Sequence, residues 1–250
     1  MIDFFYSLNP LIQTLIASFG TFFINSLGAS TIFLFKNINK EKMFILLSIS
    51  AGVMLASTFF SLINPALDYG KHSLLMSILG ILFGGLLLFF GDKIYNNDDK
   101  TNMLVLSMTL HNFPEGMAIG VAFGAAIYGI HGATIMGALT LAIGIGIQNF
   151  PEGSALSFPL YKKGYSKFKS YFISTATAIV EPIGALIGLY LAIKLQILLP
   201  FFLAFAAGAM LYVIVIELIP ESMATENKNK MALYLIIGFI IMMTLDVALG

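Results

Sequence analysis

The chain of 250 residues contains no cysteine, no tryptophan and no arginine, and charged residues make up only 10% of it. Without cysteine there is neither a disulfide nor a thiolate ligand, so methionine is the sole source of sulfur for a metal. The charges are balanced, with 13 basic and 13 acidic residues. The lysines build no continuous basic surface, which argues against a nucleic-acid partner. A soluble domain would need far more surface charge.

Apolar residues are abundant: they make up 58% of the sequence, and the mean hydropathy is +0.92. A helix that crosses a bilayer needs roughly 20 apolar residues. Blocks of this kind occupy about residues 11–35, 43–63, 73–91, 103–127, 133–160, 170–193, 198–219 and 231–249. They predict an all-α polytopic membrane protein with eight transmembrane helices. No linker divides the blocks, so we expect residues 1–250 to form a single transmembrane domain.

The lysines predict how these helices are oriented. If both termini face the exterior or periplasm, the inner loops contain Lys36, Lys40, Lys42, Lys93, Lys100, Lys162, Lys163, Lys167, Lys169, Lys228 and Lys230. Only Lys71 and Lys194 then lie outside. Because cytoplasmic loops are enriched in lysine, we expect extracytoplasmic termini in a multi-pass protein of the inner or plasma membrane.

One internal repeat carries polar residues into the apolar blocks. The hexapeptide His111-Asn112-Phe113-Pro114-Glu115-Gly116 of the fourth block returns in the fifth as Gln148-Asn149-Phe150-Pro151-Glu152-Gly153. Consecutive spans run in opposite directions, so the copies should face each other as an inverted pair. Inverted repeats that meet near the midplane are typical of alternating-access carriers.

Three carboxylates fall at mid-depth, namely Glu115, Glu152 and Glu181. An ionised carboxylate there costs about 3 kcal/mol unless it is paired, solvated or bound to a cation. His111 precedes Glu115 by four residues, and Gln148 precedes Glu152 by the same spacing, so each pair projects from one helix face. Each pair could close on one ion.

Proline stands beside all three carboxylates, as Pro114, Pro151 and Pro182. Within a helix, proline removes an amide donor and leaves a carbonyl oxygen free about one turn earlier. Imidazole, carboxylate and amide ligands together suit Zn, Fe(II), Mn, Co or Cd better than Mg or Ca. A single proline kink would be structural, but two facing copies and a third Glu-Pro pair favour an ion site.

Two residues outside the repeat are weaker candidates for the transport pathway. Met54, midway along the second block, could offer a thioether, although packing is the usual role of a membrane methionine. Asp246 lies near the end of the last block and could belong to a proton or exit pathway.

Several segments together resemble one family, the ZIP (Zrt/Irt-like) metal transporters, and especially their bacterial GufA-like branch. They are the paired HNFPEG and QNFPEG hexapeptides, the VEPIGALIG segment at 180–188, AGVMLASTFFSLI and FAAGAMLYVIVIELIPES. The resemblance covers essentially the whole chain. It implies an eight-helix carrier with outward termini that moves zinc and related divalent ions into the cytoplasm. It also implies an elevator-like motion of helices one, four, five and six against the other four.

The resemblance further implies a two-metal site. One ion position would be lined by His111, Glu115, Gln148, Glu152 and Met54, and its neighbour by Asn112, Glu115, Asn149, Glu152 and Glu181. Many members have His where Gln148 stands, and some have Asp where Asn149 stands. Three carboxylates leave two divalent ions with one uncompensated positive charge, so a single-ion and a two-ion site both stay open.

Other functions compete with metal transport. The three glutamates could instead form the proton relay of a carrier or channel for another solute. A metal-dependent hydrolase fits worst, because there is no His-Glu-x-x-His motif and His111 is the one histidine inside a span. We therefore expect a transporter and not an enzyme, with no cofactor and with zinc or a related divalent metal as its substrate. Its partners would be the ion and the lipid bilayer, and a homodimer is one option for its assembly.

Overall fold

The computed structural model describes residues 2–35, 39–68, 72–94, 100–127 and 133–249, and within these helices a few side chains, including that of His111, are not described. The described residues are almost entirely helical. The elements are α1 (Ile2–Tyr6), α2 (Pro10–Leu34), α3 (Lys40–Ser57), η1 (Thr58–Ile63), α4 (Asn64–Leu67), α5 (Ser73–Ile94), α6 (Lys100–Ile127), α7 (Ile135–Lys162), α8 (Lys167–Thr177), α9 (Val180–Lys194), η2 (Gln196–Leu198), α10 (Leu199–Val213), η3 (Ile214–Leu218), α11 (Ile219–Ser222) and α12 (Lys228–Leu249).

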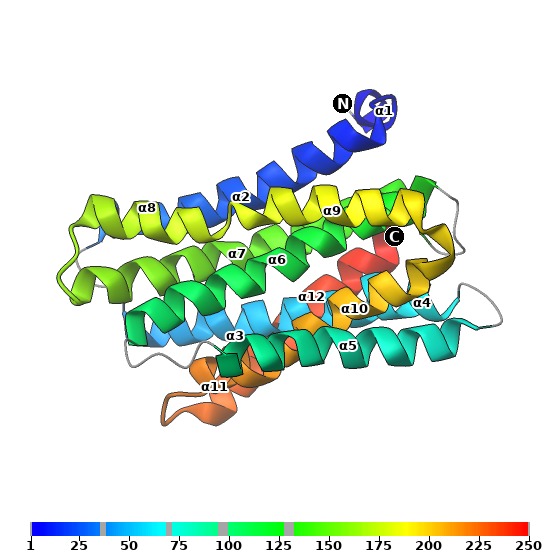
Figure 1. Ribbon diagram of the computed structural model, residues 1–250. Coiled ribbons are helices and arrows are strands. Elements are labelled where there is room, and N and C mark those ends of the chain that lie inside the picture. The colour runs from blue at the N-terminus through cyan, green and yellow to red at the C-terminus, as the bar shows by residue number, and fades with distance from the viewer. Residues whose placement is uncertain (1, 36–38, 69–71, 95–99, 128–132, 250) are drawn as a thin grey trace.

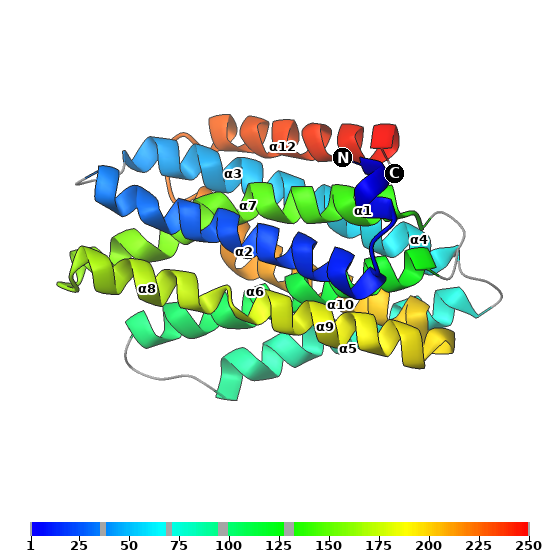
Figure 2. The same ribbon diagram turned by 90° about the horizontal axis from the view of Figure 1, so that it is seen from above.

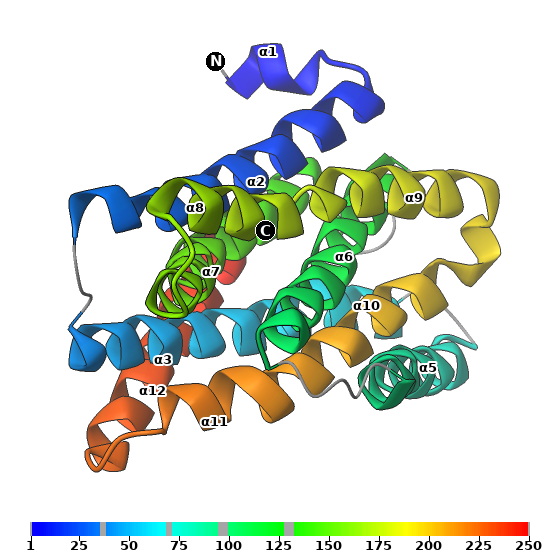
Figure 3. The same ribbon diagram turned by 60° about the vertical axis from the view of Figure 1, so that its left-hand side comes forward.

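The expected all-α membrane fold is confirmed, since helices occupy all eight apolar blocks. By length and hydropathy, 6 helical stretches of the described chain could each cross a membrane. The two remaining long helices, α6 and α7, have 28 residues each. They carry the polar hexapeptides and lie between α2 and α9 on one side and α3 and α10 on the other (Figures 1 and 3). The count of eight spans therefore stays a prediction.

The helices run along a common direction, and both chain ends lie towards the same end of the bundle (Figures 1 and 2). The end of α7 with Lys162, and the loop with Lys163 that joins α7 to α8, lie at the opposite end. Large apolar side chains remain exposed along the outer helices, especially α5 and α12. Exposed apolar side chains of this kind are suited to a lipid environment.

The sixth block is one helix in the prediction but two in the structure. Helix α8 ends at Thr177 and α9 begins at Val180. Pro182 has no amide hydrogen for the carbonyl of Ala178, and that carbonyl instead accepts a bond of 3.0 Å from the Glu181 amide. The tightened turn places Glu181 in the first turn of α9, where the helix dipole favours a negative charge.

Glycine decides which helices pair closely. A β-carbon on Gly116 would overlap the backbone of Glu181, and one on Gly28 would overlap the backbone of Phe150. These contacts join α6 to α9 and α2 to α7. Gly52 meets Leu235, so α3 joins α12, and Gly84 meets Phe205, so α5 joins α10, in the same way. Small residues let backbones approach where hydrophobicity alone drives no association between helices.

Candidate ion site

The three predicted carboxylates come together inside the bundle. The side chains of Glu115, Glu152 and Glu181 are at most 1% exposed. Glu181 is close enough to both Glu115 and Glu152 for their charges to interact. The carboxylates come from three different helices, α6, α7 and α9.

The two copies of the hexapeptide meet, as predicted. Gln148 Nε2 on α7 donates a hydrogen bond to Glu115 Oε1 on α6. Asn149 Nδ2 donates to Glu181 Oε1 on α9 at 2.9 Å. An amide of the second copy thus contacts each of two carboxylates. Within the described part of the chain, no three His, Cys, Asp or Glu side chains lie close enough together to hold a metal ion by themselves.

Several buried oxygens of this region are left over for a cation. Gln148 Oε1 and Asn149 Oδ1 make no hydrogen bond with any described residue, and neither does the amide of Asn112, which is fully buried. A buried polar atom without a partner is costly. Together with the imidazole of His111, which is on α6 like Asn112, carboxylate and carboxamide oxygens form a ligand set that suits a divalent transition metal.

Proline frees backbone oxygens beside the same residues. Pro114 and Pro151 lie inside continuous helices, so the carbonyls of Leu110 and Ile147 lose their usual amide donors. These are the two carbonyl oxygens that the sequence analysis expected proline to leave free. The helices are nevertheless not interrupted there, in contrast to the break ahead of Glu181.

Of the remaining candidates, Met54 lies in α3 and is fully buried. Ser50, one turn before it, donates a hydrogen bond of 3.3 Å to the carbonyl of Gln148, so this face of α3 lies against the site. The side chain of His111 falls outside the described side chains. Its helix position is one turn before Glu115.

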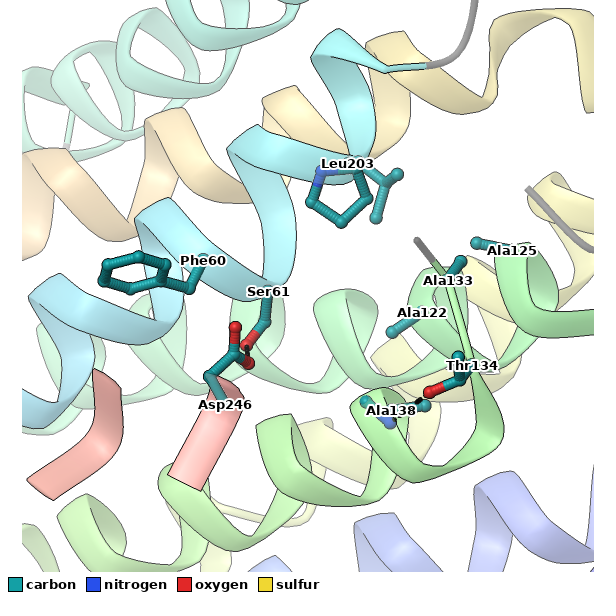
Figure 4. Close-up of a pocket in the computed structure, with 11 residues that line it drawn as sticks. Phe60, Ser61, Ala122, Ala125, Ala133, Thr134, Ala138, Leu203 and Asp246 are labelled. Carbon is teal, nitrogen blue, oxygen red and sulfur yellow. Dashed lines mark hydrogen bonds between the residues drawn. The ribbon is translucent and has the colours of Figure 1, made fainter. Parts of the chain in front are cut away.

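Asp246 does not belong to this cluster. It lies in α12, towards the end of the bundle that holds the chain termini, where Ser61 Oγ donates a hydrogen bond of 2.6 Å to its Oδ1. The two residues line a cavity of about 70 Å³ together with Phe60, Pro65, Ala122, Ala125, Ala133, Thr134, Gly137, Ala138 and Leu203 (Figure 4). A cavity of this size has room for a few water molecules.

One residue of the site was missed by the sequence analysis. Thr21 of α2 donates its hydroxyl to Glu181 Oε2, so donors from α2 and α7 hold both oxygens of this carboxylate. Each carboxylate oxygen retains a further lone pair for a cation. No motif in the first apolar block points to Thr21 by itself.

Comparison with known proteins gives a consistent result. A family model described as ZIP Zinc transporter matches residues 95–246. The zinc transporter ZIP11 of Xenopus tropicalis is 30% identical, with 97% of this chain and 98% of that protein aligned. The zinc transporter GufA of Myxococcus xanthus is 34% identical over 76% of this chain and 81% of its own. The zinc transporter ZIPB of Bordetella bronchiseptica is 32% identical, with 82% and 71% aligned.

Proposed function

The chain belongs to the ZIP zinc transporter family, and from this premise we propose that it carries zinc and related divalent transition-metal ions across a cell membrane. It is a transporter and not an enzyme, and the metal is its substrate. The observation that carries the proposal is the set of buried carboxylates, Glu115, Glu152 and Glu181, two of which accept a hydrogen bond from an amide of the repeat. A divalent cation offsets the cost of burying these charges.

The ion would be held by the residues of the repeat. One position uses His111, Glu115, Gln148, Glu152 and Met54, and the neighbouring position uses Asn112, Glu115, Asn149, Glu152 and Glu181. Glu115 and Glu152 would bridge the two positions. The side-chain oxygens of Gln148, Asn149 and Asn112 support this assignment. They accept no hydrogen bond from a described residue and are therefore available as direct ligands in addition to the carboxylates.

The mechanism is an elevator-type movement of one group of helices against another. We define the carrier body as α2, α6, α7, α8 and α9, and the frame as α3, α5, α10 and α12. The glycine-mediated backbone contacts named above join helices within the carrier body or within the frame. Gly144 of the carrier body instead meets the side chains of Met242 and Val53 of the frame. Interlocked backbones favour a rigid unit, whereas side chains at a boundary can be exchanged.

Hydrogen bonds support the same division. Bonds between Thr31 and Ser154, between Ser174 and the Gly153 carbonyl, and between Ser26 and Tyr171 join helices of the carrier body. The bond from Ser50 to the Gln148 carbonyl crosses the boundary and is long, at 3.3 Å. Movement along the boundary would break this long hydrogen bond at little cost.

The cavity beside Asp246 would be the entrance for the ion. With the termini outside, the lysine-rich end faces the cytoplasm, and the cavity lies towards the outer end between the frame and the carrier body. From Ala138, which lines the cavity, to Gln148 is about 15 Å along α7. Asp246 would attract cations there, which gives it a role at the entrance in place of the proton or exit pathway considered from the sequence. Transport would run towards the cytoplasm.

Zinc uptake into proteoliposomes tests the function. We expect the natural chain to accumulate zinc, and Glu115→Gln, which removes one charge with little change of shape, to reduce uptake to the level of protein-free liposomes. Glu41→Gln is the matched control, because Glu41 is half-exposed and pairs with Lys230 away from the site. If Glu115→Gln retained full zinc uptake, the site assignment would be wrong. Proton flux without zinc dependence would favour a proton relay instead.

A further inference from the structure

Helix α2 contacts α7 in the same way as α9 contacts α6. A β-carbon on Gly153 would overlap the carbonyl oxygen of Asn25, just as one on Gly116 would overlap the carbonyl oxygen of Glu181. Gly153 and Gly116 are equivalent positions of the two hexapeptides. The contact therefore places Asn25 on α2 where Glu181 stands on α9.

A second pair of contacts has the same register. Gly28, three residues after Asn25, packs on the carbonyl of Phe150, and Gly184, three residues after Glu181, packs on the carbonyl of Phe113. Phe150 and Phe113 are again equivalent positions of the hexapeptides. Two independent contacts thus give the same correspondence between α2 and α9.

The sequences of the two segments agree with this correspondence. Ser, Thr and Gly recur with identical spacing around the compared position, as Ser18, Thr21, Asn25 and Gly28 and as Ser174, Thr177, Glu181 and Gly184. The threonine hydroxyls also lie at the same place in the two segments, since Thr21 Oγ1 is 2.9 Å from the Ser18 carbonyl oxygen and Thr177 Oγ1 is 2.8 Å from the Ser174 carbonyl oxygen. The segments are a structural repeat in which a carboxylate replaces a carboxamide.

We infer that Asn25 is a further ion-binding residue, which offers its carboxamide oxygen to the transported cation from α2. This inference rests on the proposed function, because it concerns the same ion. Asn25 is 1% exposed, and neither its Oδ1 nor its Nδ2 makes a hydrogen bond with any described residue. One turn earlier on the same helix face, Thr21 reaches Glu181. Asn25 thus lies beside the site, because its own backbone contacts Gly153 and Thr21, one turn away, contacts Glu181.

Asn112 completes the comparison. On one side of the repeat, Asn149 donates a hydrogen bond to Glu181. The equivalent pair on the other side is Asn112 and Asn25, and both of these side chains are buried without a partner among the described residues. A buried amide that only filled space would be replaced by an apolar side chain at a gain, because an unpaired amide is costly. A cation that is shared between the two sides accounts for both.

The first test measures zinc affinity by titration calorimetry and thermal stability on the purified full-length protein. We expect Asn25→Ala to weaken zinc binding by about tenfold, while the midpoint of thermal unfolding without zinc stays the same or rises because an unpaired amide is removed. Ser77→Ala, which removes a buried hydroxyl without a described partner from α5 of the frame, should leave the affinity unchanged. Equal affinities of Asn25→Ala and the natural chain would overturn the inference alone. No zinc binding by the natural chain would overturn the proposed function as well.

The second test moves the charge to the equivalent position. Glu181→Gln should weaken zinc binding, and Asn25→Asp in the same chain should recover most of the loss, because it returns a carboxylate to the other side of the repeat. Asn9→Asp is the control, since it adds the same charge to α2 at its N-cap, where aspartate also caps well. Recovery that is no larger with Asn25→Asp than with Asn9→Asp would overturn the inference, even if Asn25→Ala failed to fold.

Discussion

Asn149 Nδ2 donates a hydrogen bond of 2.9 Å to Glu181 Oε1, and this bond joins α7 to α9 inside the candidate site. An amide at this position stabilises an ionised Glu181 when no cation is bound. It also contributes no charge of its own when a cation is bound. The identity of residue 149 therefore sets both the stability of the site without metal and the number of ions that it can neutralise.

Asn149→Asp should change both properties in opposite directions. Without metal, two carboxylates would face each other, so we expect the midpoint of thermal unfolding to fall. With zinc, the fourth negative charge would neutralise a second ion, so we expect a larger zinc-induced rise in the midpoint and a stoichiometry that increases towards two. Differential scanning fluorimetry and titration calorimetry measure these quantities. Asn39→Asp, at the N-cap of α3, is the control. The prediction would be contradicted if Asn149→Asp bound zinc with the same stoichiometry as Asn39→Asp.

Asp246 should affect how zinc is captured rather than how it is carried. Asp246→Asn keeps the shape of the side chain and its contact with Ser61 but removes the charge that faces the cavity. We expect the KM for zinc uptake to rise about threefold to tenfold with little change in the maximal rate. The charge of Asp246 would help to capture zinc but would take no part in the later steps of transport. Ser61→Ala, which leaves the charge in place, should have a smaller effect. A fall in maximal rate at unchanged KM would refute the role at the entrance.

The elements and the core of the site were accessible from the sequence because their signals are local. Apolar blocks long enough to cross a bilayer gave the helices. The exact return of Asn-Phe-Pro-Glu-Gly at 112–116 and 149–153 gave the pair of facing copies. Buried carboxylates in an apolar chain are rare enough that Glu115, Glu152 and Glu181 stood out.

Tertiary contacts were needed for the rest. The break before Glu181 depends on how Pro182, Ala178 and the neighbouring helix fit together, since Pro114 and Pro151 cause no such break. The correspondence of α2 with α9 rests on a few spaced residues within segments that otherwise differ. A spacing of this kind becomes convincing only when Gly153 and Gly116 are seen to make the same contact.

The position of Gly116 gives a prediction about stability. A β-carbon there would overlap the backbone of Glu181, so Gly116→Ala should force α6 and α9 apart at a cost of about 1–3 kcal/mol. Gly20→Ala is the control on α2, because nothing lies within 4 Å of its added β-carbon. Alanine favours a helix by about 1 kcal/mol over glycine, so this control should unfold at the same or a higher temperature. Equal stability of the two variants would contradict the close pairing of α6 and α9.

Cross-linking tests the division into carrier body and frame, and the chain is suited to it because it has no cysteine of its own. Thr31 Oγ1 and Ser154 Oγ lie 3.0 Å apart within the carrier body. A β-carbon on Gly144 would lie 3.7 Å from Val53 Cγ1 of the frame, and the flexible thioether of Met242 would have to shift. Both pairs are thus close enough for a disulfide between introduced cysteines.

The two cross-links should have opposite effects on transport. After oxidation, Thr31→Cys with Ser154→Cys should retain zinc uptake, because it joins helices that move together. Val53→Cys with Gly144→Cys should lose uptake and regain it on reduction, because it fixes α7 to α3. Each reduced double variant serves as its own control for misfolding. Full uptake by the oxidised second pair, with the disulfide verified by mass spectrometry, would exclude a sliding movement at this boundary and leave a fixed channel as the simpler mechanism.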